Sequence, residues 1–221
     1  MDVAAIGFDL DGTLLETHRD LGAAVNHALS AGGFATVPTE ESTDLIGGGA
    51  KAMLARAVAA QGALPEAAFR PLYKTMLTFY AENNAVHSRA YPGVVATLDA
   101  LAARGVAMAV VTNKFESFAR DILTQLGLAD RFVCIIGGDT MGKGNAKPSA
   151  APVLEAMRRC NADAATFAFV GDSSYDVGAA KAAGVRVVVA AYGYCDGPVD
   201  RLGGDAVIES FAHLPAALER L

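Results

Sequence analysis

Short runs of apolar residues recur along the chain, and within each run nearly every position is apolar rather than every second one. Such runs are typical of strands covered on both faces of a sheet. From residue 92 onward, segments with apolar residues three or four positions apart, the spacing of amphipathic helices, separate the runs. This alternation predicts an α/β fold with a doubly wound parallel sheet. The expected strands are Val3–Phe8, Val106–Val111, Phe132–Ile136, Phe167–Val170, Val185–Ala190 and Ala206–Ile208.

One long interruption separates the first two expected strands. Between Glu16 and His87 the sequence shows no strand pattern, only three apolar stripes with helical spacing. The segment is too long for an ordinary crossover between parallel strands, so we interpret it as an inserted, all-helical subdomain. The predicted division is a core of residues 1–15 and 90–221 with an insertion of residues 16–89.

Charge and cysteine content bear on the class of protein. The chain has 18 basic and 24 acidic residues, a net charge of -6, which disfavours general binding to nucleic acid or to an anionic membrane. Its apolar runs are far shorter than the roughly 18 residues of a membrane span. Three scattered cysteines, Cys134, Cys160 and Cys195, form no C-x-x-C pair. We therefore expect a cytoplasmic protein without disulfides, either a monomer or a homodimer.

Polar residues follow the expected strands at the edge where parallel sheets bind ligands. Carboxylates gathered there repel one another unless a cation lies among them, and Mg²⁺ suits oxygen ligands beside a phosphate group. With a lysine and the N–H groups of the Gly12–Thr13 turn, the site would attract a phosphoryl dianion. Asp9 is then our candidate nucleophile, and Asp11 our candidate acid and base. The strand-end segments are Asp9–Thr13, Val111–Lys114 and Gly171–Asp176, together with Lys147.

Four of these segments, taken in order, carry a resemblance. They are Asp9-x-Asp11-x-Thr13, Thr112-Asn113, Lys147-Pro148 and Gly171-Asp172-x3-Asp176. The set resembles the four motifs of the haloacid dehalogenase-like superfamily over essentially the whole chain, including the helical cap that the family's type 1 members insert after the first motif. The resemblance implies a Rossmann-like core and a Mg²⁺-dependent phosphomonoester phosphatase that works through an aspartyl phosphate.

The resemblance also implies a role for each motif residue. Asp9 would be the nucleophile and a metal ligand, and Asp11 would be the acid and base, with its main-chain carbonyl on the metal. Asp172 would be a further ligand, while Asp176 would orient the waters of the metal or Lys147. Thr112 would bind the phosphoryl oxygens with Asn113 beside it, and Lys147 would neutralise Asp9 and the transferring group.

Within the superfamily, further strings resemble phosphoglycolate phosphatases. This favours 2-phosphoglycolate, hydrolysed to glycolate and phosphate, while pyrophosphate, sugar phosphates and nucleoside monophosphates remain alternative substrates. In the cap, Gly47, Gly48, Gly49 and Lys51 stand at the expected start of a helix, where N–H groups bind anions, and are our candidate contacts to this small phosphorylated metabolite. The strings are Leu45–Ala50, Val111–Lys114, Ile136–Asp139 and Ala191–Tyr194.

Some features depart from the family pattern or have no assigned role. Glu16-Thr17 replaces the usual Asp-Ser pair at the expected hinge. Lys143 could be mistaken for the motif lysine, but we favour Lys147 because Pro148 suits the first position of a helix. None of the four histidines is spaced from another as metal ligands are. Only His18 lies in the expected hinge between the core and the insertion. The four are His18, His27, His87 and His213.

Two other classes of protein fit parts of the sequence. Gly137-x4-Gly142-Lys143 nearly matches a nucleotide-binding P-loop, but Gly144 stands where a serine or threonine should bind Mg²⁺. A receiver-like module that accepts phosphate on Asp9 without turnover would need neither Asp11 nor the insertion. Both remain alternatives to the phosphatase hypothesis.

Overall fold

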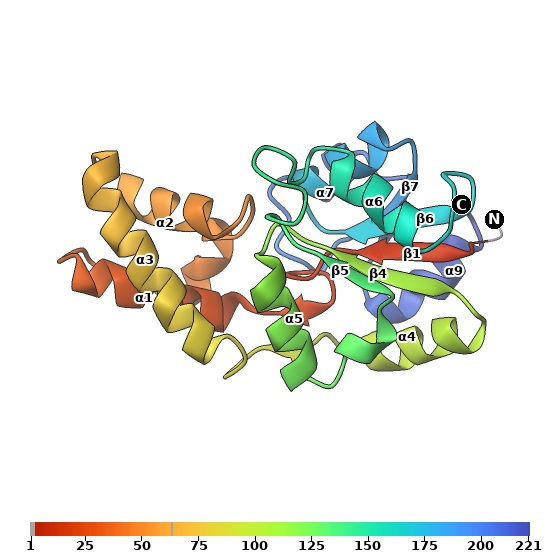
Figure 1. Cartoon of the computed structure of the whole chain (residues 1–221), viewed down its shortest axis with the longest axis horizontal. Helices are drawn as coiled ribbons and strands as arrows, with labels where there is room; N and C mark the ends of the chain where they lie inside the picture. Colours follow the sequence, from red (N-terminus) through yellow and green to blue (C-terminus); the bar gives the residue numbers. More distant parts are fainter. Residues whose placement is uncertain (1–2, 63) are drawn as a thin grey trace. The chain divides into compact units, whose positions relative to one another are not determined.

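The computed structural model describes residues 3–62 and 64–221 (Figure 1). Contacts divide the chain into two compact units: unit 1, Met1–Glu16 with Ala90–Leu221, and unit 2, Thr17–Arg89. The sequence analysis placed the insertion at residues 16–89. Residues 1, 2 and 63 of the predicted ranges lie outside the described residues.

Unit 1 is built on a six-stranded sheet in the order β5-β4-β1-β6-β7-β8. All of its strand pairs are parallel, as expected for strand and helix in alternation. The predicted fold class is thus confirmed, and each expected strand is present. The strands are β1 (Ala5–Phe8), β4 (Ala107–Val111), β5 (Cys134–Ile136), β6 (Phe167–Gly171), β7 (Arg186–Ala190) and β8 (Ala206–Ile208).

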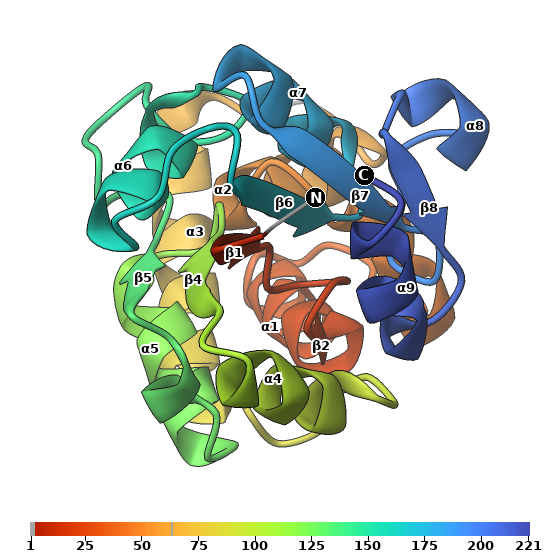
Figure 2. The ribbon, with the colours of Figure 1, turned by 90° about the vertical axis from the view of Figure 1, so that its right-hand side faces the viewer.

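Helices cover both faces of this sheet. In Figures 1 and 2, α6 and α7 lie on one face, and α4, α5 and α9 lie on the other. Right-handed crossovers between parallel strands account for this division, because the chain runs from β1 outward to β5 and then returns across β1 to β6. The helices of unit 1 are α4 (Val94–Ala103), α5 (Glu116–Gln125), α6 (Ala151–Arg159), α7 (Ser174–Ala182), α8 (Val199–Leu202) and α9 (Leu214–Leu218), with 3₁₀ turns η2 (Ala129–Arg131) and η3 (Phe211–His213).

The central strands are buried along their whole length, as their unbroken apolar runs predict. All residues of β1 and β6 are buried. Phe167 and Phe169 lie in a core cluster with Val153 and Met157 of α6. The strand ends that carry the polar motifs are therefore fixed by a packed core.

Helix α6 packs on the core through Val153, Ala156 and Met157, which leaves Leu154 48% exposed. The predicted start of this helix is wrong. Pro148 does not begin the helix: α6 starts at Ala151, whose N–H donates to Ser149 Oγ (3.2 Å). Pro148 lies before this start and is joined to Lys147 by a cis peptide bond.

Unit 2 is helical, and its apolar stripes lie where the sequence places them. The stripe from Leu21 to Leu29 is buried in α1, and the stripe from Met53 to Val58 is buried in α2. A 3₁₀ segment, η1, was not expected. The elements are α1 (His18–Ala31), η1 (Thr39–Leu45), α2 (Ala50–Ala59) and α3 (Glu66–Asn83).

Two short strands that the sequence analysis missed occur where the chain passes between the units. β2 (Leu15–Glu16) and β3 (Arg89–Ala90) form a two-stranded sheet. Glu16 therefore ends a strand, and Thr17 precedes α1. Among the described residues, no helix has the length and hydropathy needed to cross a membrane.

Candidate active site

Two carboxylates meet at the carboxyl edge of the sheet because their strands are neighbours. Asp9 directly follows β1 and Asp172 directly follows β6. The strands pair with Phe8 opposite Val170, and the Asp9 N–H donates to the Val170 carbonyl (2.9 Å). Both residues are buried, Asp172 at 2% exposure.

Lys147 lies between two carboxylates. Its Nζ is 2.7 Å from Asp9 Oδ1 and 2.6 Å from Asp176 Oδ1. Burial alone would lower the pKa of the ammonium, but the charges of Asp176 and Asp9 outweigh it and raise the pKa. Lys147 is therefore a permanently charged group inside the site.

Asp176 is held on both of its oxygens. While Oδ1 accepts from Lys147, Oδ2 accepts from the backbone N–H groups of Asp172 (3.2 Å) and Ser173 (3.0 Å) and from the Ser173 hydroxyl. Asp176 and Ser173 form a capping box at the start of α7. From the sequence Asp176 was expected to orient the waters of the metal or Lys147; in the structure it contacts Lys147 and also caps α7.

The carboxylates carry more negative charge than Lys147 compensates. Burial raises the pKa of Asp9, the positive charge of Lys147 lowers it, and the negative charge of Asp176 raises it. Together they bring the pKa of Asp9 to about 7. Burial, with the charges of Asp176 and Asp9, raises the pKa of Asp172 well above its ordinary value. A divalent cation would relieve this repulsion.

The oxygen atoms of these residues fit a hard cation. Ligand atoms of Asp9, Asp172 and Asp176 all lie within 4.8 Å of one another, and among the described residues this is the one such cluster of histidine, cysteine, aspartate or glutamate. Three carboxylates are the donor chemistry that Mg²⁺ prefers. Asp176 already pairs with Lys147 through Oδ1 and accepts three hydrogen bonds through Oδ2, so Asp9 and Asp172, which accept fewer, are the better placed ligands.

Asp172 is oriented by groups from two other loops. Thr13 Oγ1 donates to its Oδ1 (3.3 Å), and the Tyr194 N–H donates to its Oδ2 (2.6 Å). A Cβ at Gly12, where φ is +85°, would lie 2.2 Å from Asp172 Oδ2. Position 12 therefore needs glycine both for its backbone conformation and for the close approach of the carboxylate.

The N–H groups of the Gly12–Thr13 turn do not point outward as the sequence analysis expected. The Gly12 N–H donates to the Leu15 carbonyl (2.9 Å), and the Thr13 N–H donates to the Leu10 carbonyl (3.4 Å). The Tyr192 hydroxyl also donates to the Thr13 carbonyl (2.9 Å). In this structure the turn supports Asp172 rather than offering its own donors to an anion.

Asp11 faces a lysine to which the sequence analysis gave no role. Lys114 Nζ lies 2.7 Å from Asp11 Oδ1 and 2.9 Å from Oδ2, and the lysine is 8% exposed. The available signal was its place directly after Thr112 and Asn113, at the end of β4.

Thr112 and Asn113 lie next to Lys147 and Lys114. The buried Thr112 Oγ1 accepts from the Lys114 N–H (3.2 Å). Asn113 Nδ2 donates to the main-chain carbonyl of Lys147 (3.0 Å). The ends of β4, β1 and β6 and the segment before α6 thus supply one connected set of polar groups.

The candidate residues of unit 2 also lie close together. Gly47, Gly48 and Gly49 have φ values of +113°, +71° and +87° and lead into α2, which begins at Ala50. Arg56 Nη1 donates to the carbonyls of Leu45 (2.6 Å) and Gly47 (2.9 Å) and so fixes this loop. Lys51 is exposed and lies 3.3 Å from Glu66 Oε1.

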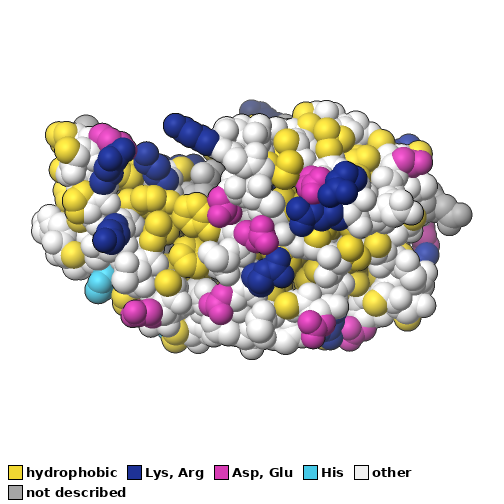
Figure 3. Space-filling view, in the orientation of Figure 1, with side chains coloured by type: hydrophobic (Ala, Val, Ile, Leu, Met, Phe, Trp, Pro, Cys, Tyr) yellow, Lys and Arg dark blue, Asp and Glu magenta, His cyan; other side chains and the backbone are white. Residues whose placement is uncertain are grey.

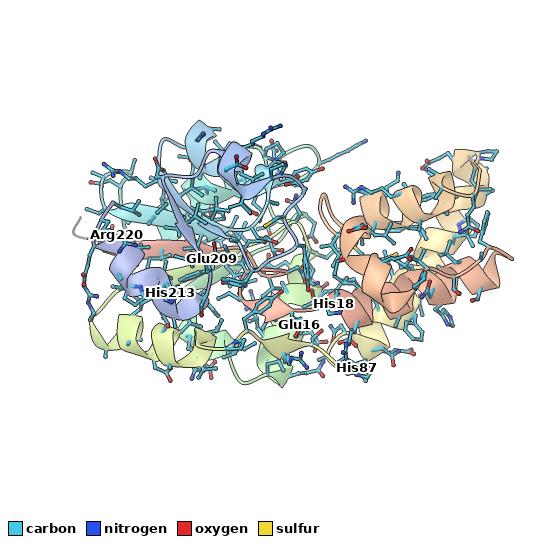
Figure 4. All side chains as sticks on the ribbon, turned by 180° about the vertical axis from the view of Figure 1, so that it is seen from behind. Glu16, His18, His87, Glu209, His213 and Arg220 are labelled. Atoms are coloured by element: carbon cyan, nitrogen blue, oxygen red, sulfur yellow. The ribbon has the colours of Figure 1, made fainter. Side chains whose placement is uncertain are left out.

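His18 and His27 both belong to α1, His87 follows α3 and His213 belongs to η3; Figure 4 labels His18, His87 and His213. His18 begins α1, and His213 ends η3 in unit 1. His27 stacks on Phe79 in unit 2 (ring centroids 4.4 Å apart). No histidine belongs to the metal-ligand cluster found among the described residues.

The loop after β5 does not have the form of a P-loop. A nucleotide-binding P-loop leads directly from its lysine into a helix. Here Lys143 is exposed, and α6 begins only at Ala151. On the face that Figure 3 shows, acidic and basic side chains are interspersed over unit 1.

Comparisons with known proteins agree with this geometry. A family model described as haloacid dehalogenase-like hydrolase matches residues 6–190. A phosphoglycolate phosphatase of Agrobacterium fabrum is 42% identical over 97% of this chain and 92% of its own, and one of Rhodospirillum rubrum is 40% identical over 95% and 88%. The crystal structure of a predicted phosphoglycolate phosphatase from Haemophilus somnus superposes with a TM-score of 0.90, at 34% identity over 98% of both chains.

Proposed function

The chain belongs to the haloacid dehalogenase-like hydrolase family, and on this basis we propose that it hydrolyses small phosphomonoesters, with 2-phosphoglycolate as the substrate. The observation that carries the proposal is the arrangement of Asp9, Lys147 and Asp172 at the carboxyl edge of β1 and β6. The names of the relatives support the choice of 2-phosphoglycolate.

In the first step that we propose, Asp9 attacks phosphorus. A bond forms between an Asp9 oxygen and phosphorus, the ester bond breaks, and its electron pair goes to the leaving oxygen. That oxygen takes a proton from Asp11, so the products are glycolate and an aspartyl phosphate. The Lys147 ammonium, 2.7 Å from Asp9 Oδ1, stabilises the nucleophile in its charged form.

The second step returns the enzyme to its starting state. Asp11, now ionised, takes a proton from a water molecule whose oxygen attacks phosphorus. The bond between phosphorus and Asp9 breaks, phosphate leaves, and the Asp9 carboxylate is restored. Thr112 donates its hydroxyl to the phosphoryl oxygens, and Asn113 positions Lys147 through its main-chain carbonyl.

We propose Mg²⁺ as the cofactor, held by Asp9, Asp172 and the main-chain carbonyl of Asp11. When bound, the ion would offset the repulsion among the carboxylates and polarise the phosphoryl group. Asp176 is assigned to positioning Lys147, because hydrogen bonds occupy both of its oxygens.

The residues of unit 2 enter this proposal as contacts to the part of the substrate that is not transferred. The loop Gly47–Gly49 and Lys51 are the candidates, because a glycine loop at a helix start offers N–H groups to an anion. The three free cysteines support a reducing, cytoplasmic location. For its assembly we propose a monomer or a homodimer.

The test of the function is a substrate panel with purified protein and Mg²⁺. The panel contains 2-phosphoglycolate, pyrophosphate, a sugar phosphate and a nucleoside monophosphate, each scored by kcat/KM. We expect 2-phosphoglycolate to rank first. A higher kcat/KM for another member would overturn the substrate assignment but leave the reaction class intact.

The test of the mechanism is Asp9→Asn. We expect this variant to fold normally, as judged by circular dichroism, and to lose at least about 10⁴-fold in kcat because the nucleophile is removed. Substantial turnover by a well-folded Asp9→Asn protein would contradict the mechanism.

Asp11→Asn tests the role of the acid. This variant should retain more activity on substrates with good leaving groups than on 2-phosphoglycolate, since the former need no proton.

A further inference from the structure

The active-site edge contains a second buried cation that the mechanism above leaves without a function. Lys114 and Lys147 are the two buried lysines of the described residues. Lys147 is placed between Asp9 and Asp176, whereas Lys114 contacts Asp11 with both carboxylate oxygens inside 3 Å of its Nζ. Removing an ammonium from water is costly, so its place beside the acid and base needs an explanation.

The backbone that carries Lys114 is held rigidly. Its N–H donates to Thr112 Oγ1, and its carbonyl accepts from the Gly138 N–H (2.8 Å). A Cβ at Gly137 would lie 2.8 Å from the same carbonyl and 2.2 Å from the Glu116 nitrogen. The two glycines that follow β5 thus let that loop pack directly on the Lys114 turn, and the base of the lysine side chain is preorganised.

The position of the ammonium relative to the leaving group follows from its partner. Asp11 donates its proton to the ester oxygen across one hydrogen bond, and Lys114 lies one hydrogen bond from the same carboxylate. The ammonium is therefore within about 6 Å of the ester oxygen, two hydrogen-bond lengths at most. In 2-phosphoglycolate the carboxylate is attached to the carbon that bears the ester oxygen, so its oxygens lie about 3 Å from that oxygen.

We propose that the Lys114 ammonium binds the carboxylate of the substrate and thereby selects phosphomonoesters that carry an anionic group on the carbon next to the ester oxygen. The flexible lysine stem allows the ammonium to turn from one Asp11 oxygen to the substrate. The inference rests on the proposed function and assigns its specificity to a residue of unit 1. Uncharged phosphomonoesters gain nothing from Lys114 beyond its contact with Asp11.

The experiment compares 2-phosphoglycolate with 2-phosphoglycolamide, in which a neutral carboxamide replaces the carboxylate. For each enzyme we take the ratio of the two kcat/KM values, which does not depend on the fraction of active protein. In Lys114→Met this ratio should fall about 30-fold, the effect of one lost charge-assisted hydrogen bond. Lys114→Arg, which retains the charge, should recover part of it, and the exposed control Lys143→Met should leave it unchanged.

Equal losses on both substrates would overturn the inference, because they would mean that Lys114 serves Asp11 alone. Should Lys114→Met be inactive on both, the corresponding ratio of association constants, 2-phosphoglycolate over 2-phosphoglycolamide, is measured by calorimetry in the Asp9→Asn background. There, too, an unchanged ratio overturns the proposal and a fall of about 30-fold supports it. A wild-type enzyme that hydrolyses neither compound would instead overturn the proposed function itself.

Discussion

Asp176 joins the start of a helix to Lys147. One of its oxygens completes the capping box of α7, and the other lies 2.6 Å from Lys147 Nζ. The local rule that places an acid in the first turn of a helix therefore also fixes the ammonium beside Asp9. A change at either Lys147 or Asp176 should disturb both stability and catalysis.

Lys147→Met tests this coupling. Removing the ammonium leaves Asp176 buried without its charged partner, so the free energy of unfolding should fall by about 3 kcal/mol or more. The kcat should fall at least about 100-fold, as expected when a stabiliser of the transferring group is lost. Urea denaturation and steady-state kinetics measure the two effects. Lys143→Met is the matched control, and if that variant lost activity while Lys147→Met kept it, Lys143 would be the motif lysine.

Gly171 is a second position at which one added carbon atom would disturb the contacts of Lys147. A Cβ there would lie 2.3 Å from Asp176 Cγ, so Gly171→Ala must displace the carboxylate that holds Lys147. We expect a loss of about 1–3 kcal/mol in stability and a lower kcat. At Gly197 the nearest atom to an added Cβ is 3.9 Å away, so Gly197→Ala should change stability by less than about 0.5 kcal/mol. Equal effects in thermal unfolding and kcat would contradict this explanation.

The sequence identifies the charged residues of the site better than their supports. Asp9, Asp172 and Lys147 follow from strand ends and motif spacing. Lys114 did not, because a single lysine after a strand has no pattern that distinguishes it from a surface lysine. The hydrogen bond from the Tyr194 N–H to Asp172 could not be predicted from the sequence either, because a backbone donor does not depend on the type of side chain.

At the scale of elements, one buried carboxylate holds α1 to the segment that leads out of unit 2. Asp20 is 2% exposed and accepts hydrogen bonds from the N–H groups of His87 (3.0 Å) and Ser88 (2.8 Å) and from the Ser88 hydroxyl (2.7 Å). These bonds close unit 2 on itself near both of its ends. They also account for the burial of an acid within the apolar face of α1.

Asp20→Ala should therefore loosen the exit segment. We expect the free energy of unfolding to fall by about 2–3 kcal/mol, because several buried donors lose an ionised acceptor. Native-state hydrogen exchange should become faster at the amides of His87 and Ser88 in particular. Asp44, an exposed aspartate of η1, supplies the control Asp44→Ala. Unchanged protection at both amides would show that other contacts hold this segment.

The predictability of an element depends on how much periodicity it contains. Strands such as β6 are recognisable because both faces are covered and every residue is apolar. β2 and β3 have two residues each, which is too short for a pattern of apolar residues to be recognised. The start of α6 was misplaced because Pro148 suits a first helical position, while the actual N-cap, Ala150, makes no side-chain hydrogen bond and so gives no start signal in the sequence.

For the whole molecule, the buried carboxylates make stability depend on pH. The pKa of Asp9 rises to about 7 from an ordinary value of 3.8, and that of Asp172 also rises, so folding takes up protons between those limits. The contribution of Asp9 to stability is complete below about pH 4 and is lost as the pH rises through about 7; that of Asp172 is lost as the pH rises through its own raised pKa. A bound cation should reverse this trend, because it favours the ionised forms.

Thermal unfolding with and without Mg²⁺ measures the effect. We expect Mg²⁺ to raise the Tm by about 5 °C or more at pH 8 when its concentration is about 100 times Kd, and by clearly less at pH 5.5, where protons compete for the same oxygens. Asp172→Asn should be more stable than the wild type at pH 8 without Mg²⁺ and should gain less from the ion. The same gain at both pH values, or in both proteins, would exclude these carboxylates as the binding site.

The position of β1 in the sheet has a consequence for how the chain is made. β1 lies between β4 and β6, and neither partner exists until about 100 further residues have been synthesised. Unit 2 is one continuous segment, so it can form its own contacts before β4 and β6, the partners of β1, have been synthesised. Asp9 is therefore translated long before the residues that complete its site, since Asp172 and Asp176 follow it by more than 160 positions.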